Sequence, residues 1–283
     1  MRTRLVSSLL AVHLASTFIT GVAAAALPSA GCSRQTSESG DRIERTIEVA
    51  GVTRHYILHV PQSAKPGRPA PLLLDFHGWG HSAAGVWRVS RFKEIAERDG
   101  FITVYPDGLP VTLLRGEARP GWEIAQVPGN RDLAFTTALL DRLEAELCVD
   151  RARVYSTGFS NGAFFSHILG CVQADRIAAI APVSGGHITV PCKPGRPVPV
   201  LIFHGTSDDL ISPERAHRAR DEWARIDECG EPKKGVCDRY SCKAGVEVRY
   251  CEVDIGHTWP PQATEEIWKF LREYSLPAPT GAD

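Results

Sequence analysis

Residues 153–169 read R-V-Y-S-T-G-F-S-N-G-A-F-F-S-H-I-L, and the fold class follows from this stretch. Its first part is a short apolar run of the kind that forms a buried strand, and its last part has the apolar spacing of a helix. A G-x-S-x-G pattern centred on Ser160 lies between the two parts. Its glycines leave room for a sharp turn that lifts the serine out of the fold. The stretch therefore predicts an exposed serine at the carboxyl end of a buried strand.

Similar apolar runs recur along the chain and alternate with helical patterns at 133–147, 214–226 and 264–274. The expected buried strands are residues 71–76, 101–105, 153–156, 177–183, 198–203 and 246–253. Strands that alternate with helices predict an α/β fold with a mostly parallel sheet flanked by helices. Residues 43–49 and 55–60 instead alternate apolar and polar side chains on either side of Gly51, which predicts an N-terminal antiparallel hairpin.

Length and charge limit the classes of function. The chain has 283 residues and a formal charge of −1, from 32 Lys and Arg against 33 Asp and Glu. This balance carries no electrostatic signature of a nucleic-acid partner or of binding to an anionic membrane. The sequence shows no internal repeat, so we expect one domain over residues 43–276, followed by a tail at 277–283.

The N-terminus resembles an export signal. Arg2 and Arg4 precede an uncharged run from 5 to 27 that ends in Ala24-Ala25-Ala26, which predicts a signal peptide over residues 1–26. A membrane-spanning helix is the alternative, since the run is long enough. The polar, aromatic-free residues 32–42 are expected to form a disordered linker.

The cysteines bear on how the protein is exported and on whether it contains disulfides. Ala30-Gly31-Cys32 resembles the end of a bacterial lipoprotein signal, so the signal could extend to residue 31 and Cys32 could carry a lipid anchor; plain secretion is the alternative. Eight cysteines in an exported chain predict disulfides, and four of them lie between Cys229 and Cys251, as in a stapled loop or lid. A zinc site is the weaker alternative for this cluster, because no C-x-x-C pair is present.

The partners of Ser160 follow two later strands. His204-Gly205-Thr206-Ser207-Asp208-Asp209 comes after residues 198–203, and Gly256-His257 comes after 246–253. A serine hydroxyl is a poor nucleophile unless a histidine base contacts it and an acid orients that histidine. We expect Ser160 as nucleophile, His257 as base and Asp208 as acid, in the chain order of α/β-hydrolases. Asp209 and Asp254 are the rival acids.

A glycine-rich turn, His77-Gly78-Trp79-Gly80, follows the strand at 71–76. It occupies the position of the loop that supplies one backbone N–H to an oxyanion hole in this fold. We therefore expect the N–H groups of Trp79 and Asn161 to form that hole. His77 and His204 are expected to be hydrogen-bonded structural histidines. Trp259, close to His257, and Trp79 are the expected substrate-binding aromatics, whereas Trp87 and Trp122 could equally pack in the core.

Several motifs together resemble one family. They are His77-Gly78-Trp79-Gly80, Tyr105-Pro106-Asp107-Gly108, Gly158-Phe159-Ser160-Asn161-Gly162, Ala181-Pro182-Val183, His204-Gly205-Thr206-Ser207-Asp208 and Gly256-His257-Thr258-Trp259-Pro260. In this order they are similar to the polyhydroxybutyrate-depolymerase and feruloyl-esterase group of secreted α/β-hydrolases, over about residues 43–274. The resemblance implies Ser160 as nucleophile, His257 as base and Asp208, rather than Asp209, as acid. Arg131-Asp132 departs from the paired acidic motif of the family, and the cysteine-rich run is expanded.

The resemblance implies a secreted serine esterase that needs no metal or organic cofactor. Its substrate would be a feruloyl or acetyl ester of plant polysaccharide, or a polyhydroxybutyrate-like polyester. Two alternatives remain at this stage: a serine peptidase of the same fold, and a non-catalytic binding protein on a hydrolase scaffold.

Overall fold

The computed structural model describes residues 26–35, 38–113, 116–125 and 127–277. The expected signal peptide therefore lies almost entirely outside the described residues, as does most of the expected tail. Among the described helices, none combines the length and the hydrophobicity needed to span a bilayer.

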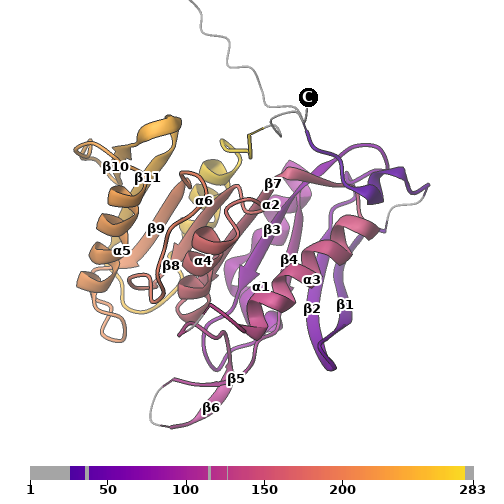
Figure 1. The fold of residues 1–283 in the computed structure, drawn as a ribbon, viewed down its shortest axis with the longest axis horizontal. Helices are drawn as coiled ribbons and strands as arrows, with labels where there is room; N and C mark the ends of the chain where they lie inside the picture. The colour runs from indigo at the N-terminus through magenta and orange to yellow at the C-terminus, as the bar shows by residue number, and fades with distance from the viewer. Residues whose placement is uncertain (1–25, 36–37, 114–115, 126, 278–283) are drawn as a thin grey trace, which may run out of the picture.

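The core of the molecule is one large sheet (Figure 1). Its strands are β1 (Gly40–Val49), β2 (Val52–Val60), β3 (Ala70–Phe76), β4 (Ile102–Pro106), β7 (Val149–Phe159), β8 (Ala179–Val183), β9 (Val200–Gly205), β10 (Asp238–Ser241) and β11 (Glu247–Val253). They lie in the order β1-β2-β4-β3-β7-β8-β9-β11-β10. Every neighbouring pair from β4 to β11 is parallel, and β1, β2 and β10 pair antiparallel at the edges. The predicted parallel sheet and N-terminal hairpin are confirmed.

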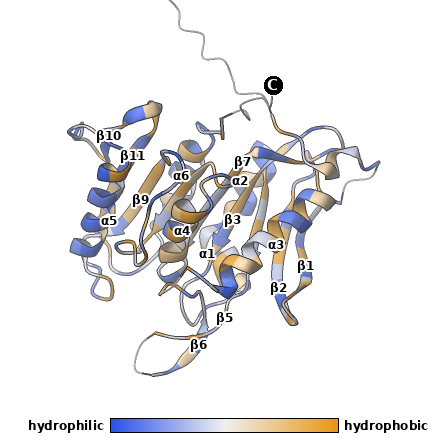
Figure 2. Ribbon diagram, viewed as in Figure 1, coloured by the Kyte–Doolittle hydropathy of each residue, from blue (hydrophilic) through white to orange (hydrophobic). Residues whose placement is uncertain are grey.

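Helices cover both faces of the sheet. They are α1 (Ala83–Ser90), α2 (Phe92–Asp99), α3 (Arg131–Glu146), α4 (Asn161–Val172), α5 (Pro213–Ile226) and α6 (Ala263–Leu271). Phe135, Phe165 and Trp223 pack α3, α4 and α5 on one face, whereas Phe92 and Trp268 pack α2 and α6 on the other. All seven residues of β3 are buried because helices cover both of its sides. Figure 2 shows the corresponding concentration of hydrophobic residues in the central strands.

Two short helices, α1 and α2, are present in the structure but were not predicted from the sequence. The backbone N–H of Gly85 donates to the Ser82 hydroxyl at the start of α1, and Gly100, with φ 77°, ends α2. Each helix has eight residues, which gives little more than two turns of periodic pattern. A hairpin of β5 (Leu109–Thr112) and β6 (Ala118–Gly121) also projects from the sheet, and it too was unexpected (Figure 1).

The expected linker at 32–42 is partly wrong. The Ser29 hydroxyl donates to the carbonyl of Leu147 at 2.7 Å, and a disulfide joins Cys32 to Cys148. At the other end, Gly40 already belongs to β1. The polar composition of this stretch indicated disorder, but the covalent link and the buried contact at Ser29 hold its beginning against the domain.

All eight cysteines form disulfides: Cys32–Cys148, Cys171–Cys192, Cys229–Cys242 and Cys237–Cys251. The cluster after α5 is therefore a pair of cross-links, as expected, and its thiols are not in the form that binds zinc. Cys237–Cys251 holds the start of β10 against β11 at the edge of the sheet, and Cys229–Cys242 ties the end of β10 to the segment after α5. This position makes the segment an edge strand rather than a lid.

Asp75 on β3 is fully buried, and it provides a test of the core. Burial raises the pKa of its carboxyl to about 7, and the nearby Ser90 hydroxyl only partly opposes this. In the unfolded chain the pKa is near 4. Between these values the unfolded state loses its proton while the folded state keeps it, so the free energy of unfolding falls as the pH rises from about 4 to about 7.

We expect Asp75→Asn to remove this pH dependence, because the amide has no charge to bury. The variant should be more stable than the wild type by roughly 2 to 4 kcal/mol at pH 8 and differ much less at pH 4. Urea unfolding of the disulfide-intact protein at both pH values measures this. Asp175→Asn, at an exposed aspartate after α4, is the control. An equal change in stability at both pH values would refute the explanation.

Candidate active site

Ser160 lies at the junction between β7 and α4, with φ 54° and ψ −115°. A non-glycine residue in this region is strained and persists only where its surroundings impose it. The two glycines that flank Ser160 show how its surroundings impose this conformation. A Cβ at Gly162 would lie 2.1 Å from the Phe76 carbonyl oxygen, and one at Gly158 would lie 2.6 Å from that of Gly162. Only a G-x-S-x-G sequence allows β3, β7 and α4 to approach so closely.

Asp208 and His257 meet beyond the carboxyl ends of β9 and β11. The His257 Nδ1 donates to Asp208 Oδ2 at 2.7 Å. The other oxygen, Oδ1, accepts from the backbone N–H groups of Leu210 and Ile211 at 3.0 and 2.8 Å. The carboxylate is buried, and these bonds hold it in one orientation. With Nδ1 as the donor, Nε2 of His257 is left as the atom that can take a proton.

The rival acids lie elsewhere. Asp209 is exposed, and Asp254 accepts from the hydroxyls of Thr206 and Ser207 at 3.3 and 3.2 Å. Of the three aspartates considered from the sequence, Asp208 is the one that contacts His257. The geometry therefore agrees with the choice of Asp208 over Asp209.

Ser160 and His257 line the same cavity, which has a volume of about 340 Å³. The Phe159 ring packs against the His257 imidazole, with ring centroids 4.8 Å apart. The lining is mostly apolar: Trp79, His81, Leu113, Ile124, Phe159, Ser160, Asn161, Phe164, Leu210, Ile211, Arg215 and His257. A pocket of this size and character is typical of a site for a small organic ligand.

Two buried histidines support the loops of the site. The His77 Nδ1 donates to the Gly78 carbonyl at 2.7 Å, and its Nε2 accepts from the Gly108 N–H at 2.9 Å. The His204 Nε2 donates to the Ile211 carbonyl at 2.8 Å. Burial lowers the pKa of both imidazoles, so both are neutral and hold a fixed tautomer. His77 joins the Trp79 turn to the β4–β5 turn, and His204 supports the Asp208 loop.

Trp79 and Asn161, the two expected oxyanion donors, both line the cavity. Asn161 is the first residue of α4, and first-turn N–H groups have no acceptor within their own helix. Gly78 packs against Ser160, since a Cβ at Gly78 would lie 3.3 Å from the Ser160 Cβ. The turn that carries Trp79 is therefore directly beside the serine.

The β5–β6 hairpin holds the Trp79 turn in place. The Trp79 indole Nε1 donates to the Val111 carbonyl at 2.9 Å, and the Gly80 N–H donates to the Pro120 carbonyl at 2.7 Å. Just after β6, Trp122 binds the Asn161 side chain at two points. Its N–H donates to Asn161 Oδ1 at 2.7 Å, and its carbonyl accepts from Asn161 Nδ2 at 3.1 Å. One hairpin thus contacts both expected oxyanion donors.

Asp132 anchors the segment that follows the hairpin. Its Oδ1 accepts from Arg54 at 2.7 Å in a fully buried ion pair, and its Oδ2 accepts from the Glu123 N–H at 2.9 Å. Asp132 is the acidic residue of the Arg131-Asp132 pair, where the chain departs from the paired acidic motif of the family. By holding Glu123, Asp132 also fixes the adjacent Trp122, which binds the Asn161 side chain.

Trp259 corrects one expectation. It is not among the described residues that line the cavity, and only 8% of its surface is exposed. Its ring packs edge-on against Phe92, and its Nε1 donates to the Thr264 hydroxyl at 3.0 Å. Proximity to His257 in sequence indicated a pocket wall, but the loop turns the indole into the core. Trp122 is also fully buried, whereas Trp79 does line the cavity.

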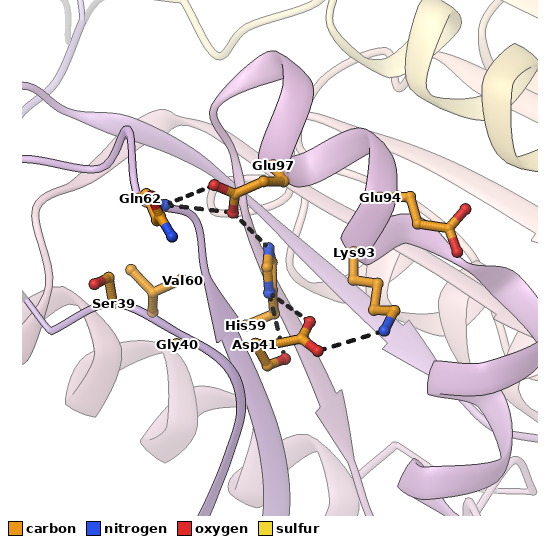
Figure 3. A pocket seen from close by; sticks show the side chains of 9 residues that line it. All are labelled: Ser39, Gly40, Asp41, His59, Val60, Gln62, Lys93, Glu94 and Glu97. Carbon is orange, nitrogen blue, oxygen red and sulfur yellow. Dashed lines mark hydrogen bonds and ion pairs between the residues drawn. The ribbon is translucent and has the colours of Figure 1, made fainter.

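A larger cavity of about 550 Å³ lies at the other edge of the sheet (Figure 3). There His59 lies 3.4 Å from Asp41 Oδ1 and 3.6 Å from Glu97 Oε2. His59 pairs with Thr103 at the start of β4, whereas Ser160, Asp208 and His257 follow strand ends. In parallel sheets of this kind ligands bind at the carboxyl ends of the strands. We therefore assign the functional site to the cavity at Ser160, although the cavity at His59 is larger.

Solved structures with similar folds define the class. An acetyl xylan esterase from Aspergillus awamori aligns with a TM-score of 0.64 and 14% identity, over 81% of this chain and 98% of that one. A ferulic acid esterase aligns with a TM-score of 0.58 and 17% identity, over 82% and 96%. These identities establish the fold alone, and the predicted α/β-hydrolase fold is confirmed.

Sequence relatives identify the group more closely, although no family model matches the chain. Feruloyl esterase B of Piromyces equi is 31% identical, over 79% of this chain and 46% of that protein. A bifunctional acetylxylan esterase/xylanase of Neocallimastix patriciarum is 26% identical, over 82% and 35%. Feruloyl esterase D of Neurospora crassa is 28% identical, over 80% and 77%. The expected similarity to feruloyl esterases is confirmed, and the chain spans less than half of the first two relatives.

Gly121, at the end of β6, provides a test of the hairpin. A Cβ at this position would lie 2.7 Å from Asn161 Oδ1 and 3.0 Å from Trp79 Cδ1. Gly121→Ala should therefore move both expected donors while leaving Ser160 and His257 in place. We expect kcat for a short 4-nitrophenyl ester to fall about tenfold to a hundredfold with a smaller change in KM, because the lost contacts act on the transition state.

Gly195→Ala is the matched control, since a Cβ there meets no atom within 4 Å. It should keep the wild-type kcat and melting temperature. A Gly121→Ala variant with unchanged kcat would show that the hairpin does not position the donors.

Proposed function

We propose that the chain is a serine carboxylic-ester hydrolase. The observation that carries this proposal is the hydrogen bond of 2.7 Å between His257 Nδ1 and Asp208 Oδ2. His257 lines the same cavity as the strained Ser160. A strained serine next to an oriented histidine is the arrangement that activates a hydroxyl for attack. The esterase names of the sequence relatives support the same chemistry.

The proposed reaction has two steps. His257 Nε2 takes the Ser160 proton as the hydroxyl oxygen attacks the ester carbonyl, and the N–H groups of Trp79 and Asn161 stabilise the oxyanion. The protonated His257 then donates its proton to the departing alcohol, which leaves an acyl-enzyme. Water attacks that acyl group with His257 again as base, and the acid is released. Asp208 holds the imidazole in the productive tautomer and stabilises its charged form.

We propose an aromatic acyl ester of plant polysaccharide, such as a feruloyl ester, as the substrate. The names of the relatives point to feruloyl and acetylxylan esters. Trp79, Phe159 and Phe164 line a cavity of about 340 Å³, which is larger than an acetyl group requires and suits a planar aromatic acid. Acetylated xylan and a polyhydroxybutyrate-like polyester are the alternatives that an assay must compare.

We also propose that the protein is exported and loses its signal peptide, residues 1–26. The mature protein would then consist of one domain over residues 43–276, preceded by the segment that contains Cys32. Four disulfides support an oxidising compartment. Because Cys32 is bonded to Cys148, its sulfur is not available for a lipid thioether, which favours secretion over a lipid anchor.

We expect Ser160→Ala to retain the fold and lose turnover by about 10⁴-fold or more, and Asp208→Asn to lose about 10³-fold to 10⁴-fold through the wrong histidine tautomer. Initial rates with 4-nitrophenyl acetate and unfolding curves measure both effects. Asp209→Asn is the matched control and should keep most of the activity. Retained turnover in Ser160→Ala would refute the assignment.

A substrate panel tests the proposed ester class. Methyl ferulate should give a higher kcat/KM than methyl acetate, and release of ferulate from feruloylated polysaccharide should exceed release of acetate from acetylated xylan. A preference for acetylated xylan or for a polyester film would contradict the aromatic assignment while leaving the esterase mechanism intact.

A further inference from the structure

Arg215, on the first turn of α5, lines the cavity that contains Ser160. It is the one described lining residue with a permanent positive charge, and no Asp or Glu is among the described lining residues. Its neighbour on the helix, Glu214, is exposed and outside that lining. Among its described lining residues, this mostly apolar pocket thus contains a cation without a matching anion.

The Arg215 guanidinium forms no ion pair with any carboxylate in the described part of the chain. It lies over the ring of Phe164, 5.2 Å from the centroid, and both residues line the cavity. Gly186 keeps the pair close, because a Cβ there would lie 2.9 Å from Phe164 and 3.1 Å from Arg215. The planar guanidinium keeps its hydrogen-bond donors available, and their geometry matches a carboxylate.

The positive charge of Arg215 also acts on a neighbouring ionisable group. The pKa of His187 is lowered by burial and, beyond that, by the positive charges of Arg215 and Arg218. The field from α5 therefore acts on a neighbouring ionisable group. The same field would favour an anionic group on a ligand in the cavity.

The position of Arg215 defines where that anionic group would lie. Phe164 is four residues after Ser160 on α4, about one helical turn or roughly 6 Å along the axis. Arg215 packs on this ring and lines the same cavity as Ser160, so a ligand in that cavity can contact both residues. A volume of about 340 Å³ accommodates a six-carbon chain or a para-substituted benzene ring.

We propose that Arg215 selects esters that carry a carboxylate within reach of its guanidinium when the scissile carbonyl lies at Ser160. The inference rests on the proposed esterase function and extends it, since a simple feruloyl or acetyl ester has no such group. The carboxylate can belong to the acyl part, as in a half-ester of a dicarboxylic acid, or to the alcohol part, as in an ester of an acidic sugar. Arg215 is thus a specificity residue and takes no part in proton transfer.

Two matched pairs of esters test the proposal and distinguish the two sources. The acyl pair is 4-nitrophenyl hemiadipate and 4-nitrophenyl hexanoate, which differ in the terminal carboxylate of a six-carbon acyl chain. The alcohol pair is 4-acetoxybenzoate and 4-acetoxybenzamide. For each pair the measured quantity is the ratio of kcat/KM for the charged ester to kcat/KM for the neutral one.

We expect Arg215→Gln to lower this ratio about tenfold to a hundredfold for one of the two pairs, the loss that follows from removing a charge-assisted bond. Arg215→Lys should restore part of the ratio, because it keeps the charge without the planar fork. Arg218→Gln, at an exposed arginine on the same helix outside the described cavity lining, should leave the ratio near the wild-type value. In the wild type the ratio should fall as salt is added.

The proposal is wrong if Arg215→Gln leaves both ratios unchanged, or if Arg218→Gln lowers them equally, which would indicate a diffuse field. Melting temperatures of the variants show whether a fall in the ratio of kcat/KM values comes from a destabilised fold. A higher ratio in Arg215→Lys than in Arg215→Gln excludes destabilisation as the cause. Failure of the esterase proposal gives a different result: all four esters would turn over no faster with the wild type than with Ser160→Ala.

Discussion

The close approach of α4 to the end of β3 is the constraint on which the rest of the site depends. At Gly162 the helix backbone meets the Phe76 carbonyl so closely that no side chain fits between them. This contact forces the turn at Ser160 into its strained conformation, with φ 54°. It also places the first N–H groups of α4 beside the glycine-rich turn after β3. The proposed nucleophile and the turn that carries one expected oxyanion donor are therefore brought together by this backbone contact.

The second layer of the site is made of polar contacts between segments distant in the chain. The β5–β6 hairpin bonds to the Trp79 turn, and Trp122, just beyond it, binds the side chain of Asn161. Asp132 joins the same segment to Arg54 on β2. On the other side of the cavity, the buried His204 supports the loop from which Asp208 reaches His257. These hydrogen bonds join buried groups, which keeps the proposed reacting atoms in fixed relative positions.

Much of this could be predicted where a local pattern has one physical meaning. Alternating strands and helices imply a parallel sheet, and G-x-S-x-G at a strand end implies the strained turn, so the mostly parallel sheet and the place of Ser160 at a strand end followed. Trp259 could not be predicted in the same way, because nearness to His257 along the chain does not determine which way a side chain points. Gly121 and Arg215 carry no motif at all. Their importance comes from atoms that approach them from segments distant in sequence.

The sequence by itself determined the parallel strands with the longer helices, the serine turn, and the three strand ends that carry Ser160, Asp208 and His257, because these depend on periodicity and on the steric needs of glycine. Only the tertiary structure decided that Asp208 rather than Asp254 contacts His257, which cysteines pair, and that Arg215 has no counterion among the described residues that line the cavity. Hydrogen bonds, disulfides and ion pairs act over a few ångströms. Which groups come that close is set by how the whole chain packs, and no local pattern in the sequence records it.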